Sequence, residues 1–205
     1  MTGPTVRSAA LRRPLAALLA LLLLLTLAPA TGASAATSYD VEARYDVDVR
    51  LDWASRWVDL RTIIDVRNTA GQTIDRLELN TAAVKLGAWR NLRVRVDGAS
   101  VEARVVGQTI TVPLPTPLAA GASTEVFVGF KSRLTTTASK RSYYWAKLNG
   151  VVQMYRFIPW VSRKIPFGNS NHGEPFVTPV SPRVEVTVSS DRKLVWAATG
   201  RRVSK

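Results

Sequence analysis

The chain of 205 residues contains no cysteine and a single histidine, His172. A catalytic zinc site needs about three protein ligands, and a Ser-His-Asp triad needs a histidine that a carboxylate orients. One histidine and no cysteine are too few for either site, and the lack of cysteine excludes disulfide bonds. We therefore expect no catalytic residue, metal site or cofactor in this chain, and a role in binding, scaffolding or supporting another domain.

The amino terminus has the order of residues that is typical of a secretory leader. Arg12 and Arg13 precede an apolar run from Leu15 to Leu25, and small residues follow the run. The run is about half as long as a membrane-spanning helix requires. We expect a signal peptide over residues 1–35, cleavage between Ala35 and Ala36, and secretion without a transmembrane anchor. The arginine pair leaves the twin-arginine route open, although ordinary export is favoured.

Beyond the leader, apolar and polar residues alternate along most of the chain. The alternation is strict over residues 39–52 and resumes over residues 58–66, which predicts a long antiparallel hairpin. Asp97-Gly98 and Asn149-Gly150 are pairs that two-residue hairpin turns prefer. We predict one all-β domain over residues 36–205, an antiparallel sandwich or saddle of twisted sheets with no helix longer than two turns.

Shorter alternating stretches predict the remaining strands. Prolines at positions 113, 115 and 117 indicate that the strand holding them lies at an edge or ends early. Residues 132–142 and 159–182 lack any period and are expected to be loops. The expected short strands cover residues 74–80, 92–96, 101–105, 110–114, 126–130, 143–148, 151–158, 184–188 and 194–198.

Positive charge is concentrated in the last third of the chain. Residues 37–130 hold 11 Lys and Arg against 12 Asp and Glu, whereas residues 131–205 hold 14 against 3. Such a region suits an acidic polymer or an acidic partner domain, with no specific nucleic acid indicated. Aromatic side chains interleave with cations here, so a polyanion or glycan surface is one interpretation and core packing of the rings is the other. The cations of this surface are Arg141, Lys147, Arg156, Arg163 and Lys164.

Two acidic groupings are weaker metal candidates. His172 and Glu174 share a polar segment, but a third ligand would have to come from elsewhere in the chain. Asp46, Asp48 and Asp52 alternate along a predicted strand, where side chains on one face lie about 7 Å apart, too far for a compact calcium loop. We interpret them as a charged outer face.

Several blocks of sequence occur in the order of a known domain. The blocks are Tyr39-Asp40-Val41, Asp65 to Thr69, Ile74 to Asn80, Pro117-Leu118-Ala119-Ala120-Gly121, Phe157-Ile158-Pro159, Arg183 to Val188 and Ala197 to Gly200. Together they resemble the amino-terminal β-domain of the M1 family of zinc metallopeptidases, the aminopeptidase N-like and leukotriene A4 hydrolase-like enzymes. The alternative is a secreted β-sandwich protein that is unrelated to this family.

The resemblance implies that a separate domain carries the catalytic residues. In the family, a following domain carries Gly-x-Met-Glu-Asn and the zinc-binding His-Glu-x-x-His, and neither motif occurs in this chain. We therefore expect a non-catalytic, truncated member, whose partner would be an M1-type catalytic domain encoded downstream and holding the zinc. The family's β-domain also lends a polar side chain to the substrate's free amine. Gln153 is the candidate for this contact, although its spacing to Pro159 departs from the family pattern.

Two other classes of function stay open. One is a stand-alone secreted binding module that uses the basic last third for a polyanion or glycan. The other is a complete enzyme of unknown type, which the residue inventory disfavours.

Overall fold

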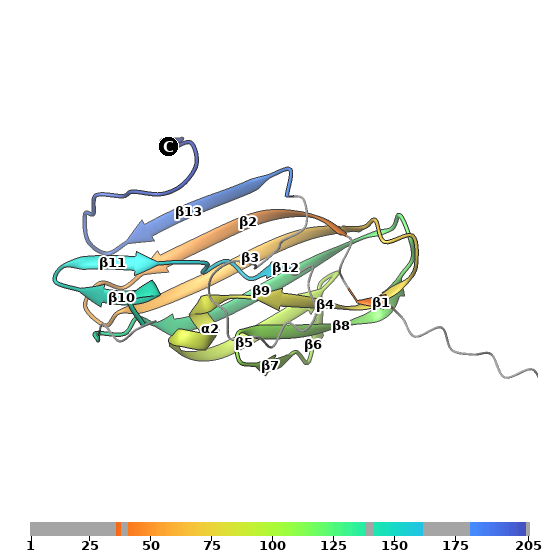
Figure 1. Cartoon of the computed structure of the whole chain (residues 1–205), viewed down its shortest axis with the longest axis horizontal. Helices are drawn as coiled ribbons and strands as arrows, with labels where there is room; N and C mark the ends of the chain where they lie inside the picture. The colour runs from red at the N-terminus through yellow and green to blue at the C-terminus, as the bar shows by residue number, and fades with distance from the viewer. Residues whose placement is uncertain (1–35, 38–40, 138–141, 162–180, 204–205) are drawn as a thin grey trace, which may run out of the picture. The chain divides into compact units, whose positions relative to one another are not determined.

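The computed structural model describes residues 36–37, 41–137, 142–161 and 181–203 (Figure 1). Their regular structure is almost entirely β, in a six-stranded sheet, a five-stranded sheet and a two-stranded hairpin. The predicted all-β class with mainly antiparallel pairing is confirmed. In this part of the chain, no helix has both the length and the apolar character needed to cross a bilayer.

The six-stranded sheet is built around the predicted long hairpin and has the order β13-β2-β3-β9-β5-β6. Every neighbouring pair is antiparallel except β13, which runs parallel to β2. Its strands are β2 (Val41–Leu51), β3 (Trp57–Asn68), β5 (Ala88–Val96), β6 (Ala99–Val101), β9 (Ser123–Arg133) and β13 (Val184–Ser190).

The five-stranded sheet has the order β1-β4-β8-β7, with β12 paired to β4 as well. Its strands are β1 (Ala36–Thr37), β4 (Ile74–Asn80), β7 (Arg104–Val106), β8 (Thr109–Leu118) and β12 (Trp160–Val161). The hairpin consists of β10 (Trp145–Leu148) and β11 (Val151–Met154), preceded by the 3-10 helix η1 (Ser142–Tyr144). A five-residue helix, α2 (Ala82–Leu86), connects β4 to β5.

Strand alternation places the core between the two sheets. Every second residue of β2 and β3 is buried, while the residues between them are mostly exposed and charged. The buried side chains of both sheets form one hydrophobic cluster, which includes Val47, Leu60, Leu77, Ile110 and Phe130. The predicted sandwich therefore buries the inner face of each sheet against the other.

The end of β3 is fastened by one buried side chain, that of Asn68. Its amide nitrogen donates to the carbonyl oxygens of Gln72 and Leu118, each at 2.8 Å. Its side-chain oxygen accepts from the backbone N–H of Ala70 at 2.9 Å. A fully satisfied buried amide of this kind fixes the geometry of the segments that it joins, here the β3–β4 loop and the end of β8.

Turn chemistry was predicted correctly at both hairpin pairs. Asp97 and Gly98 have φ angles of 49° and 81°, and Asn149 and Gly150 have φ angles of 48° and 77°. Positive φ at both central residues is the requirement of a type I′ turn. The proline prediction also holds, because β7 pairs with β8 only at residues 109–111, Pro113 pairs with β4 alone, and the register shifts before the next pair at Leu118.

Several predictions were wrong in detail. Tyr143 and Tyr144 belong to η1 and not to a strand, and Trp160 and Val161 form β12 inside the predicted loop. Residues 101–105 do not form one strand: β6 belongs to one sheet and β7 to the other. The predicted loop from residue 132 begins later, because Ser132 and Arg133 still pair in β9. The second hairpin strand ends at Met154, so residues 155–158 lie outside it. Residues 194–198 form no strand, and Val195 is fully exposed and so has no packing that would hold a strand there.

Tyr45, on the inner face of β2, connects the two sheets. Its side chain is 2% exposed, and its hydroxyl accepts from the backbone N–H of Val161 at 3.0 Å. The ring packs edge-on against Trp160, with centroids 4.7 Å apart. Burial raises the pKa of Tyr45, because a phenolate in this position would lose its hydration.

Replacing Tyr45 by Phe should therefore reduce stability in a pH-dependent way. At neutral pH, Tyr45→Phe strands the Val161 N–H and lowers the free energy of unfolding by about 1–3 kcal/mol. The unfolded phenol ionises above pH 10.0, while the folded one keeps its proton. Above that pH, the free energy of unfolding of the wild type therefore falls toward that of Tyr45→Phe by about 1.4 kcal/mol per pH unit. Urea unfolding of both proteins measures the difference, and a gap that stays constant from about pH 9 to 11 would contradict the account.

Candidate functional site at the hairpin end

The β10–β11 hairpin projects the residues that the sequence singled out. Asn149-Gly150 closes it, and the pairs from Trp145 opposite Met154 to Leu148 opposite Val151 set its register. Val152 and Met154 pack on the core, whereas Gln153 between them is exposed. Alternation therefore turns the candidate substrate contact toward solvent, on a strand whose other face is anchored.

Trp145 anchors the hairpin, and Gly87 makes room for it. Trp145 is fully buried and is the largest such side chain among the described residues. Gly87 ends helix α2, and a Cβ atom there would collide with the hydroxyl of Ser132 and with the indole of Trp145. The Ser132 hydroxyl donates to the carbonyl oxygen of Ala83 at 2.7 Å, so it is not free to retreat. The helix end, β9 and the hairpin thus meet at one close contact.

Lys147 and Trp53 form a second anchor of the hairpin. The Lys147 ammonium donates to the Trp53 carbonyl oxygen at 2.6 Å and lies 4.0 Å from the centre of its ring. On the same residue, the Trp53 N–H donates to the Asp191 carboxylate at 2.7 Å, and the Arg192 guanidinium lies 5.2 Å from the ring. Trp53 thereby joins three segments, the β2–β3 turn, the hairpin and the chain after β13, and the charge of Lys147 is used within this junction.

Arg156 is engaged in a similar way. Its backbone has a φ of 47°, and its carbonyl oxygen accepts from the N–H of Ala82 at 2.9 Å. Its Nε donates to the hydroxyl of Tyr155 at 3.0 Å, with the guanidinium 5.4 Å from that ring. Tyr155 in turn packs on Tyr144, with centroids 4.9 Å apart. The arginine therefore contributes to the junction between the hairpin and α2.

The predicted polyanion surface is only partly visible. Arg141, Arg163 and Lys164 lie outside the described residues, as do His172, Glu174 and Ala35. Lys147 and Arg156 come from the same end of the sandwich, and both charged groups contact neighbouring rings. Ala36 is the first residue of β1.

The candidate calcium residues are spread apart. Asp46 and Asp48 lie on β2, opposite Ile63 and Arg61 of β3. Asp52 instead accepts from the N–H of Ser55 at 2.8 Å, a turn contact that lowers the pKa of its carboxyl group. Among residues 41–137, 142–161 and 181–203, no three His, Cys, Asp or Glu side chains come together as potential metal ligands.

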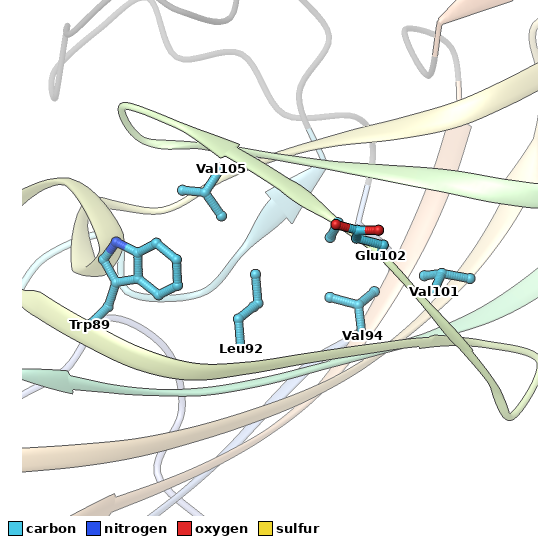
Figure 2. A pocket seen from close by; sticks show the side chains of 7 residues that line it. Trp89, Leu92, Val94, Val101, Glu102 and Val105 are labelled. Atoms are coloured by element: carbon cyan, nitrogen blue, oxygen red, sulfur yellow. The ribbon is translucent and has the colours of Figure 1, made fainter.

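A groove that the sequence did not predict opens between the sheets near β6 and β7. Its volume is about 560 Å³. Figure 2 shows Trp89, Leu92 and Val94 of β5 on one side of the groove, with Val105 and Glu102 on the segment opposite. The lining residues are Trp89, Leu92, Val94, Val101, Glu102, Ala103 and Val105. Trp89 lies outside every strand predicted from the sequence, so no sequence signal identified this groove.

Comparison with known proteins gives matches in structure alone. No family model matches the sequence, and no curated protein matches it. Among solved structures, the M1 zinc metallopeptidase from Deinococcus radiodurans is 18% identical, with a TM-score of 0.46 over 73% of this chain and 32% of that chain. A mutant of an M1 zinc metallopeptidase from Deinococcus radiodurans, bound to a Tyr-Ser-Ala substrate, is 16% identical, with a TM-score of 0.47 over 73% of this chain and 33% of that chain.

The chain therefore spans about a third of the length of these solved chains. Values at this level do not define a family.

The close contact at Gly87 gives a direct test of how the hairpin is held. Gly87→Ala should lower the free energy of unfolding by about 1–3 kcal/mol, because the added methyl group overpacks a site bounded by Trp145 and Ser132. Gly129→Ala is the matched control, since its methyl group would meet mainly the half-exposed ring of Phe127. Chemical denaturation measures both. Equal, small effects would show that the hairpin is not seated as described.

Proposed function

We propose that this chain is the non-catalytic amino-terminal β-domain of an exported M1-like zinc aminopeptidase. Its role is to support a catalytic domain and to present the β10–β11 hairpin to it. The activity and the zinc belong to that partner domain.

The observation that carries the proposal is that the blocks of the resemblance, which are far apart in sequence, meet in pairs. Asn68, from the block at residues 65–69, bonds the carbonyl oxygen of Leu118, from the block at residues 117–121. Strand β4, which is the block at residues 74–80, continues into Thr81, whose hydroxyl donates to the carbonyl oxygen of Phe157 at 2.7 Å. If the blocks belong to one inherited domain, they are expected to contact one another in the fold. Sequence blocks that match by chance need not be in contact.

The strand that follows the opening block shares a sheet with a late block. Strand β13 contains the block at residues 183–188 and runs parallel to β2, from Val184 opposite Tyr45 to Ser190 opposite Leu51. The N–H of Tyr45 donates to the carbonyl oxygen of Arg183 at 3.0 Å. An early strand and a late strand of the resemblance are therefore adjacent, which supports treating the region between them as one unit.

The donor set of the chain assigns the metal elsewhere. Zinc in catalytic sites is held mainly by histidine, cysteine and carboxylate groups, commonly with two histidines on one helix. This chain has one histidine and no cysteine, so its own residues do not fit a catalytic zinc site.

The hairpin is the surface that we assign to the partner domain. Trp145 and Lys147 fasten one side of it, and Gln153 is exposed on β11. A polar side chain on a rigid hairpin can offer a fixed hydrogen-bond acceptor to a substrate's free amine. In this proposal Gln153 makes that contact at the edge of the partner's active site.

Capture of the native protein tests the proposal. Antibodies against the purified chain should recover, from the source organism, material that hydrolyses aminoacyl-anilides and loses the activity when a chelator removes zinc. Mass spectrometry of that material should identify a His-Glu-x-x-His sequence, either in the same polypeptide or in a bound partner.

The purified chain alone is the control and should hydrolyse no aminoacyl-anilide with or without added zinc. Captured material without peptidase activity and without a His-Glu-x-x-His polypeptide would contradict the proposal. Zinc-dependent hydrolysis by the purified chain itself would also contradict it.

A further inference from the structure

Three arginines of β5 share the outer face of the six-stranded sheet because of a single bulge. Strict alternation would put Arg90 and Arg93 on opposite faces, since they are three positions apart. Instead, Arg90 pairs with Lys131 and Arg93 with Gly129, and the pairing register shifts between them. Asn91 supplies the extra residue with a φ of 58°, a conformation that asparagine tolerates well. Arg90, Arg93 and Arg95 thus form one exposed arginine row.

Two members of the arginine row are positioned by aromatic rings. The Arg90 guanidinium lies 4.1 Å from the centre of the Trp57 ring, and that of Arg95 lies 5.5 Å from the Phe127 ring. The Phe127 ring itself lies against Gly129, where an added Cβ would approach it within 2.8 Å. Stacking limits the freedom of each guanidinium without using its N–H donors.

The charge of the row is not neutralised locally. Among the described residues, no carboxylate lies within ion-pair distance of Arg90, Arg93 or Arg95. On the same face, Asp59 is shared by Arg61 at 3.8 Å and Lys131 at 3.7 Å, and the Asp97 carboxylate beyond Arg95 accepts from the N–H of Glu125 and the hydroxyl of Thr124. Only two of the chain's 15 acidic residues, Asp40 and Glu174, fall outside the described ranges.

Neighbouring cations extend the positive surface. Arg133 is exposed on β9 and uses only its Nε, which donates to the carbonyl oxygen of Ser55 at 3.2 Å. On the other half of the same face, strand β2 alternates acids with bases, and Arg44 pairs with Glu42 at 3.4 Å. The outer face is thus mixed in charge along β2, whereas residues 90–95 of β5 contribute cations and no acid.

We infer that the arginine row binds a linear phosphodiester polymer through its phosphate groups, without reading bases. A guanidinium presents a planar fork of donors that matches the oxygens of a phosphate. Arg93 and Arg95 lie about 7 Å apart along the strand, comparable with successive phosphates of an extended chain. Binding to single-stranded nucleic acid would also require free aromatic faces for base stacking, and here both rings lie beneath guanidinium groups.

This inference does not depend on the proposed function, and it assigns anion binding to a different surface from the predicted one. The earlier candidates at residues 141, 147, 156, 163 and 164 belong to the basic last third of the chain. The arginine row belongs to residues 37–130, whose net charge is −1. The two surfaces can therefore be neutralised separately.

Binding of an abasic deoxyribose-phosphate oligomer to the full chain, measured by fluorescence anisotropy over a range of salt, tests the inference. The triple variant R90Q/R93Q/R95Q should weaken binding about tenfold or more at low salt and reduce the salt slope by about 2, because each lost phosphate contact contributes about 0.7. Two charge-matched triples, R104Q/R201Q/R202Q and R141Q/R163Q/K164Q, should bind within about twofold of the wild type. Arg104, Arg201 and Arg202 are all exposed.

Several outcomes would overturn the inference. One is unchanged binding by R90Q/R93Q/R95Q, and another is an equal loss in either control triple, which would reflect net charge alone. Oligothymidylate binding far more tightly than the abasic oligomer would indicate base recognition, and poly-glutamate binding equally well would exclude phosphate selectivity. Arg93→Glu guards against misfolding, because among the described residues Arg93 stacks on no ring: it should weaken binding about as much as the triple variant while thermal unfolding stays unchanged.

Discussion

The pairing of β3 with β2 on one side and β9 on the other is the constraint on which this structure depends. Each pair runs in register for eleven residue pairs, and every second side chain of β3 from Val58 to Asn68 is buried. Because side chains alternate with a period of two, a slip of one residue would turn the charged face of β3 into the core. The hydrophobic pattern therefore fixes the register, and Asn68 fastens its end.

The sequence was sufficient for the parts of the fold that obey this alternation. Residues 39–52 and 58–66 were predicted as a hairpin because one face had to be apolar, and Asp97-Gly98 and Asn149-Gly150 predicted their own turns. One buried position on the apolar face of β3 is polar, and the structure offers no reason for it. Thr62 is fully buried at the centre of the strand, and its hydroxyl has no hydrogen-bond partner within the described structure.

The errors arose where a local event changes the face or the sheet. The bulge at Asn91 and the passage from β6 to β7 both follow from backbone geometry, and neither leaves a mark in hydrophobic periodicity. The strand expected at residues 194–198 is absent although its residues favour β structure, because strand propensity is realised through packing and pairing. The groove lined by Trp89 and Val105 was missed because its two walls come from different sheets.

The candidate sites show the same distinction between composition and placement. Net charge drew attention to the last third of the chain, yet Lys147 and Arg156 use their charges within the fold. The arginine row of β5 comes instead from a segment that is nearly neutral overall. Summed charge describes a segment, whereas binding depends on which charges share a face and lack partners.

The central claim is that the two sheets form one cooperative sandwich, built on β3, that folds without a second domain. Hydrogen exchange of the purified chain, followed by mass spectrometry, tests it most directly. The account predicts that peptides from β2, β3 and β9 share the slowest exchange, at a rate that matches global unfolding, while residues 191–203 exchange rapidly. Exchange in β2 and β3 as fast as in residues 191–203 would contradict it, because the sheet would then lack a stable core of its own.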